Sequence, residues 1–213
     1  MVSIVLESLK TKKALFLWAV ASLACMLLIF LASSQAGDES GKVSEGLTRL
    51  IFGTVWRWLA PDGQEMSESM FEALEAFLRK AAHFVSFMTL GICAANTVRQ
   101  VCIQRWIAAS RNALASREDG EGNALAHQEG GEGNALAFRE GGEGKSLSLR
   151  VFLVSLLWCS AYGALDELHQ SFVPGRSMRW QDWVIDTVGA VVGIVVVLLV
   201  HWSNEKGRTR KKR

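Results

Sequence analysis

The stretch YGALDELHQSFVPGRSMRWQDWVIDTVGAVVG, residues 162–193, places a charged segment between two apolar runs, each long enough to approach or cross a bilayer. Ionisable groups at the edge of membrane spans are costly unless they are paired or hydrated, so they indicate a functional site. The residues of interest in the stretch are its charged residues together with His169 and Gln170: Asp166, Glu167, His169, Gln170, Arg176, Arg179, Asp182 and Asp186.

Helical periodicity predicts which residues of this stretch share a face. In the first run the face carries Tyr162, Asp166, His169 and Gln170, with Glu167 beside them. In the second run the face carries Asp182, Asp186, Gly189 and Gly193. The small residues allow a neighbouring helix to come close, and Pro174-Gly175 predicts a tight turn between the runs. We therefore expect a helical hairpin with a carboxylate-rich end at one membrane surface.

The composition indicates a membrane protein, because 50% of the 213 residues are hydrophobic and only 2 are proline. The net charge of +2 gives no sign of a nucleic-acid partner. Four segments qualify as membrane spans: residues 14–32, 81–98, 147–170 and 183–202. The expected fold is an all-α, four-span bundle whose main partner is the lipid bilayer.

Basic residues at both ends of the chain predict the orientation. Lys10, Lys12 and Lys13 precede the first span, and a run of Lys and Arg from Lys206 to Arg213 follows the last. The positive-inside rule then places both termini in the cytoplasm, and the polar stretch and the loop 33–80 outside. A rival interpretation makes residues 1–34 a cleaved signal peptide, although their apolar part exceeds the usual limit of about 15 residues.

Residues 1–110 form an N-terminal half, which consists of the first two spans and the loop 33–80 between them. Within it, residues 46–59 form an amphipathic pattern, typical of a helix lying in the membrane interface or of the core of a small loop domain. No Pro or Gly interrupts residues 66–90, so one long helix should begin outside the membrane and continue into the second span.

Residues 111–146 repeat with a period of 11, as NALA recurs at Asn112, Asn123 and Asn134. Each repeat offers one Leu against two or three Gly, too little apolar surface to offset the chain entropy. We predict a disordered, low-complexity insertion whose deletion leaves function intact. It is followed by a C-terminal hairpin, residues 147–213.

Three roles remain open for the polar residues. Asp166, Glu167, His169 and Asp182 are candidate catalytic residues, forming an acid–base or metal site that acts on a lipid-linked phosphate. Lys80, His83, Gln170, Arg176 and Asp186 are candidate binding residues, with Arg176 placed to hold a phosphate. The alternatives are a site that binds an amphiphilic ligand without chemistry, and ion pairs that only hold the helices in register. The spacing matches no strong metal signature and specifies no cofactor or oligomeric state.

The sequence resembles the VanZ-like family of small bacterial membrane proteins. The matching motifs are SSQ (33–35), RKAAHF (79–84), DELHQSFVPGR (166–176) and DWVIDTVGAVVG (182–193). The resemblance implies a helical membrane fold with these motifs on the extracytoplasmic side, and a founding member associated with teicoplanin resistance. Phe87 stands where a Tyr is expected, Asp186 stands where Asn is common, and the repeat insertion is extra. We therefore expect a cell-envelope role, in which the site binds or modifies an amphiphilic envelope component or a glycopeptide antibiotic.

Overall fold

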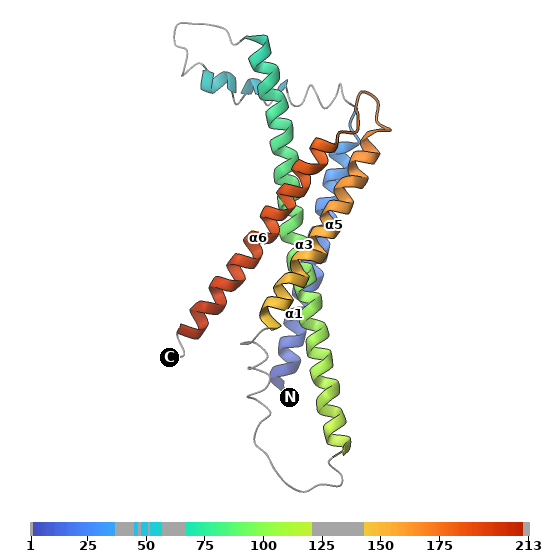
Figure 1. Cartoon of the computed structure of the whole chain (residues 1–213), viewed down its shortest axis with the longest axis vertical. Helices are drawn as coiled ribbons and strands as arrows, with labels where there is room; N and C mark the ends of the chain where they lie inside the picture. The colour runs from blue at the N-terminus through green and yellow to red at the C-terminus, as the bar shows by residue number, and fades with distance from the viewer. Residues whose placement is uncertain are drawn as a thin grey trace.

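The computed structural model describes residues 2–36, 45–46, 48–50, 52–56, 67–120 and 143–210. Four long helices form a bundle (Figure 1): α1 (Val2–Ser33), α3 (Glu68–Gly120), α5 (Glu143–Gln170) and α6 (Trp180–Arg210). The described residues contain no strand. The all-α expectation is confirmed.

Each of these helices contains a segment long and apolar enough to cross a membrane. The four segments are Leu9–Ser33, Glu68–Asn112, Ser146–Gln170 and Trp180–Asn204. They are longer than the predicted spans, because each helix continues beyond its apolar part into polar flanking sequence. The four spans expected of a multi-pass membrane protein are confirmed at the level of helix length and composition.

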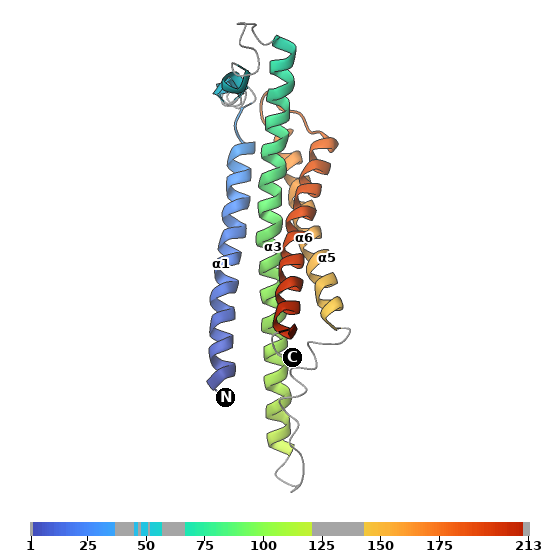
Figure 2. The ribbon, with the colours of Figure 1, turned by 90° about the vertical axis from the view of Figure 1, so that its left-hand side faces the viewer.

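Helix α3 is central, since it packs against α1, α5 and α6. Figure 2 shows it between α1 on one side and α5 and α6 on the other. Its 53 residues give a length of about 80 Å, more than twice the hydrocarbon thickness of about 30 Å. As predicted, one continuous helix leads into the second span, while its amphipathic start outside the membrane stays a prediction.

Both neighbouring helices reach into the repeat insertion of residues 111–146. Helix α3 continues through Gly120, so the first repeat copy is helical, and α5 already begins at Glu143. The Ala, Leu, Arg and Glu residues of this copy favour a helix, and extending an existing helix is far easier than nucleating a new one. Residues 121–142 lie outside the described residues, and the predicted disorder there stays a prediction.

Part of the predicted amphipathic helix is described, with helical residues at 45–46, 48–50 and 52–56. The Arg49 guanidinium lies over the Phe71 ring, 5.1 Å from its centroid, which places this segment against the beginning of α3. A position in the membrane interface stays a prediction.

Glycines bring α3 and α6 into close contact. A Cβ atom added to Gly193 would lie 2.1 Å from the Met88 carbonyl oxygen, and one added to Gly189 would lie 2.4 Å from the Phe84 carbonyl oxygen. On α3, a Cβ at Gly91 would lie 2.4 Å from the Ala190 carbonyl oxygen. Gly189 and Gly193 allow the close approach that their spacing predicts, but the helix that approaches them is α3 rather than the preceding span of the hairpin.

The connection between α5 and α6 contains the predicted turn. The Arg176 amide donates to the Val173 carbonyl at 3.1 Å, and Gly175 has a φ of 75°. Proline at the second position and a positive φ at the third are typical of a type II turn, where glycine avoids the strain of a Cβ atom. The turn sends the chain back along the bundle and presents Arg176 at its end.

Candidate functional site

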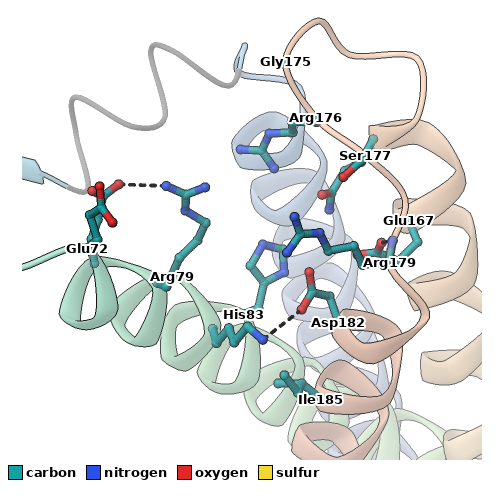
Figure 3. A pocket seen from close by; sticks show the side chains of 14 residues that line it. Glu72, Arg79, His83, Glu167, Gly175, Arg176, Ser177, Arg179, Asp182 and Ile185 are labelled. Atoms are coloured by element: carbon teal, nitrogen blue, oxygen red, sulfur yellow. Dashed lines mark hydrogen bonds and ion pairs between the residues drawn. The ribbon is translucent and has the colours of Figure 1, made fainter. Parts of the chain in front are cut away.

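A cavity of about 300 Å³ lies at the end of the bundle that carries the α5–α6 connection (Figure 3). Its walls come from α3, α5, the connection and α6, and its lining includes charges of both signs. The lining residues are Glu72, Glu75, Ala76, Arg79, Lys80, His83, Glu167, Gln170, Gly175, Arg176, Ser177, Arg179, Asp182 and Ile185.

Two acid–base contacts join α3 to α6 at different depths. Near the rim, the Lys80 Nζ lies 3.7 Å from the Asp182 Oδ1, and both side chains are partly exposed. Deeper, the His83 Nδ1 lies 3.5 Å from the Asp186 Oδ1, and the Asp186 side chain is completely buried. Solvent screens the outer pair, which contributes little to stability. The inner pair is screened less, because Asp186 is completely buried while the His83 side chain is 24% exposed, so the charge of Asp186 must be balanced within the protein.

The Asp166 carboxylate is buried between α5 and α1. The Ser33 hydroxyl donates to Asp166 Oδ2 at 2.9 Å, and the Gln170 side-chain amide donates to the same oxygen at 2.8 Å. Asp166 Oδ1 accepts no hydrogen bond from the described residues. The two hydrogen bonds to Oδ2 therefore fix the orientation of the carboxylate, while Oδ1 can still accept a hydrogen bond or bind a cation.

Glu167 is also buried, but it faces the connection. Its Oε2 accepts a hydrogen bond of 2.8 Å from the Arg179 backbone amide, just before α6 begins. Its Oε1 has no hydrogen-bond donor among the described residues. The contact ties the end of α5 to the start of α6 and closes one wall of the cavity.

Arg176 reaches from the connection to the end of α1. Its Nε donates to the Gln35 carbonyl at 3.1 Å, and its Nη2 to the Ala32 carbonyl at 3.3 Å. Burial lowers the pKa of the Arg176 guanidinium below its ordinary value, and the positive charge of Arg79 lowers it further. An arginine stays protonated despite such a shift. The lining of the cavity thus includes two guanidinium groups, Arg79 and Arg176, together with acidic residues.

His169 and Tyr162 face α1 rather than the cavity. The His169 ring stacks on Phe30 with centroids 4.6 Å apart, and its Nε2 lies 3.1 Å from the Ser34 hydroxyl. The Tyr162 hydroxyl donates to the Met26 carbonyl at 2.6 Å. These contacts fix α5 against α1.

The sequence profile of the family described as VanZ/LLP1 matches residues 18–201, which is most of the chain. The protein belongs to the VanZ/LLP1 family. No curated protein and no solved structure matches the chain. The expected family membership is thereby confirmed, and it agrees with the four apolar helices.

Two residues singled out in the sequence analysis, Phe87 and Asp186, lie close to the site. Phe87 is completely buried and packs against Tyr162, with ring centroids 6.1 Å apart, so this position is a core contact without a hydroxyl group. Asp186 is completely buried and adds a carboxylate beside His83. In this VanZ/LLP1 protein Phe87 therefore contributes a packing contact, and Asp186 contributes a buried carboxylate.

The candidate residues fall into three groups in space. Lys80, His83, Glu167, Gln170, Arg176 and Asp182 line the cavity. Asp166 and Asp186 lie beneath it, each with an oxygen atom within 4.8 Å of a His83 nitrogen. His169 lies apart, on the side of α5 that packs against α1. The four candidate catalytic residues therefore do not form one cluster.

The candidate residues named from the sequence lie in or next to the second, third and fourth spans, and the structure adds contacts from α1. Ser33, which had no assigned role, donates to Asp166, and the Ala32 and Gln35 carbonyls accept from Arg176. The SSQ motif at 33–35 was the available signal. Its hydroxyl and carbonyl groups end an otherwise apolar span, and such groups need polar partners.

Proposed function

We propose that this VanZ/LLP1 protein binds an amphiphilic cell-envelope component whose anionic headgroup enters the cavity. The observation that carries the proposal is the pair of guanidinium groups, Arg79 and Arg176, at one cavity. Guanidinium groups bind phosphate and carboxylate groups through paired hydrogen bonds. An anionic headgroup between them relieves the repulsion of the two cations.

Apolar side chains beside the cavity supply the contact for the rest of such a ligand. Phe172 is 78% exposed, Met178 56% and Trp180 67%, and all three lie on the connection or at the start of α6. Large apolar and aromatic side chains at this level suit the boundary between headgroups and acyl chains. The headgroup therefore has polar partners in the cavity while the acyl part remains in the bilayer.

The proposal includes an orientation in which both termini are cytoplasmic and the cavity faces outward. It is supported by the basic residues at both ends of the chain. In Figure 1 the α5–α6 connection and the beginning of α3 lie at the end of the bundle opposite to the N-terminus.

Cysteine labelling tests this orientation. In a chain whose four native cysteines are replaced by alanine, Ser177→Cys should react with a membrane-impermeant maleimide in intact cells. Ser203→Cys, near the end of α6, should react only after the membrane is permeabilised. Labelling of position 203 but not of position 177 in intact cells would show that the orientation is the opposite of the proposed one, with the cavity facing the cytoplasm.

Binding is tested in nanodiscs containing a polyprenyl phosphate, with the neutral polyprenol as the matched lipid and native mass spectrometry as the measurement. Arg79→Ala should weaken retention of the phosphate lipid by about 10-fold or more, as expected for lost charge-assisted hydrogen bonds. Arg79 pairs only with the partly exposed Glu75 in the contacts described, so the fold should persist. Arg176→Lys, which keeps the charge but loses the planar fork, should give a smaller loss.

The matched control is Arg105→Ala, an exposed arginine on the half of α3 far from the cavity. It should retain the phosphate lipid as the unaltered chain does. Equal retention of phosphate lipid and polyprenol by the unaltered chain would contradict the proposal. The same retention measurement with teicoplanin in place of the lipid tests whether a lipoglycopeptide occupies the same cavity.

A second candidate function is a membrane hydrolase or transferase acting on a lipid-linked phosphate. It is favoured by one observation: the cavity is bordered by a buried carboxylate, Glu167, and by His83, which are groups suited to proton transfer. Under this alternative, Glu167→Gln abolishes turnover of the lipid phosphate while leaving its binding intact. If the protein only binds the lipid phosphate, substitutions at several cavity positions should each reduce retention of the lipid by a part, and no single one should abolish it.

A further inference from the structure

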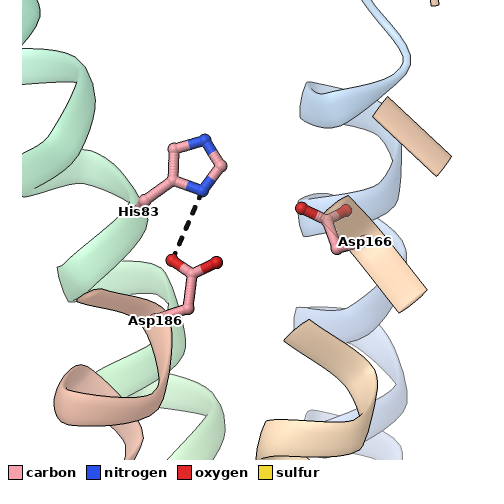
Figure 4. Close-up of side chains that lie close together, drawn as sticks. All are labelled: His83, Asp166 and Asp186. Atoms are coloured by element: carbon pink, nitrogen blue, oxygen red, sulfur yellow. Dashed lines mark ion pairs between the residues drawn. The ribbon is translucent and has the colours of Figure 1, made fainter. Parts of the chain in front are cut away.

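We propose that His83, Asp166 and Asp186 bind one divalent transition-metal ion inside the bundle, beneath the cavity. The three residues come from α3, α5 and α6, and each offers one ligand atom such that all three atoms lie within 4.8 Å of one another. Figure 4 shows the His83 ring and the two carboxylates turned toward a shared space. The inference concerns the metal alone and does not depend on the amphiphile proposed above.

Three of the four carboxylate oxygens of this trio accept no hydrogen bond from the described residues. Asp166 is 4% exposed and Asp186 is 0% exposed. Asp166 Oδ1 and both oxygens of Asp186 accept no hydrogen bond within the part of the chain that the structure describes. Buried carboxylates without hydrogen bonds are strongly unfavourable unless a cation compensates them. A protonated His83 balances one negative charge, whereas a divalent ion bound to neutral His83 balances both.

The spacing fits a small divalent ion. Metal–ligand bonds of about 2.1 Å in tetrahedral geometry separate neighbouring ligand atoms by about 3.4 Å. The His83 Nδ1 and Asp186 Oδ1 are 3.5 Å apart, so this edge already has the required length. One imidazole nitrogen and two carboxylate oxygens suit Zn²⁺ or Mn²⁺ better than the softer Cu⁺.

Contacts around Asp166 are arranged as metal sites require. The hydrogen bonds from Ser33 and Gln170 both end on Oδ2, which leaves Oδ1 without a hydrogen-bond donor among the described residues. Groups that orient a metal-bound carboxylate in this way raise the affinity of a site for its ion. Three protein ligands leave a fourth position for water or a substrate oxygen, and His83 also lines the cavity.

The test uses the full chain in detergent, stripped with a chelator and titrated with Zn²⁺ by calorimetry, with bound metal counted by elemental mass spectrometry. The unaltered chain should bind one Zn²⁺ per molecule. His83→Asn and Asp186→Asn should each weaken binding by more than about 100-fold, the upper end of the effect of a supporting residue. Ser33→Ala, which removes only a supporting hydroxyl, should weaken it by about 10-fold.

The matched control is Asp182→Asn, the same substitution one turn earlier on α6 and outside the trio. It should bind Zn²⁺ as the unaltered chain does. Thermal unfolding gives a second measurement: Zn²⁺ should raise the Tm of the unaltered chain and of Asp182→Asn, but not that of Asp186→Asn. The proposal is overturned if the stripped chain binds no Zn²⁺, or if Asp186→Asn and Asp182→Asn bind it equally.

Discussion

Gly193→Ala should destabilise the bundle by about 1–3 kcal/mol, the usual cost of forcing an extra group into a packed interface. The new Cβ atom would lie 2.1 Å from the Met88 carbonyl oxygen and 3.0 Å from the Ile92 nitrogen. Both atoms belong to the backbone, so no side-chain rotation relieves the clash, and α6 must move away from α3. The measurement is reversible unfolding in detergent, followed by circular dichroism.

The matched control is Gly207→Ala, on the same helix. A Cβ at Gly207 has no atom within 4 Å, so this change should be neutral or stabilise α6 by up to about 1 kcal/mol through helix propensity. Equal stability of the two variants would show that the helices do not approach each other at Gly193. Displacement of α6 should also draw Asp186 away from His83, which couples this packing contact to the interior site.

Glu167→Ala should accelerate hydrogen exchange of the Arg179 amide on the order of 10–100-fold, because a buried hydrogen bond to a carboxylate is lost. The Glu167 Oε2 accepts from this amide at 2.8 Å, and Glu167 is only 1% exposed. The effect should be local: amides at the centre of α3 should keep their protection. Exchange mass spectrometry with peptides covering residues 171–183 provides the measurement.

Glu167→Gln separates hydrogen bonding from charge. Its side-chain carbonyl can still accept from Arg179, so exchange should stay within a few-fold of that of the unaltered chain, consistent with the modest net value of a neutral hydrogen bond. If glutamine accelerates exchange as much as alanine does, the carboxylate charge rather than the hydrogen bond orders the connection. If neither variant has an effect, the contact does not order it.

Much of the architecture could be predicted because it depends on local sequence. Four apolar runs of sufficient length specify four helices, since every backbone polar group in a bilayer must be satisfied within the segment. Pro174-Gly175 specified the turn of the hairpin, and the spacing of Gly189 and Gly193 specified a face suited to close packing. The limit of α3 was less predictable, because a helix that has formed extends easily into sequence that would not nucleate one.

The candidate site was less predictable, because periodicity identifies a shared face but not the helix that covers it. Asp166 and His169 are three residues apart, yet Asp166 lies near His83 and Asp186 while His169 stacks on Phe30 of α1. A face of an α-helix spans a wide arc, and two neighbouring helices can divide it. Ser33 was missed for the same reason, since its contact with Asp166 joins residues 133 positions apart.

The sequence by itself determined that this VanZ/LLP1 protein has four apolar helices, a tight hairpin between the last two, and ionisable groups at the ends of its spans. These properties follow from hydrophobic length, turn chemistry and helical spacing. Only the tertiary structure decided that α1 completes the site and that His83, Asp166 and Asp186 come together. Those contacts depend on how closely helices approach across glycine surfaces, and that distance arises from packing between segments remote in sequence.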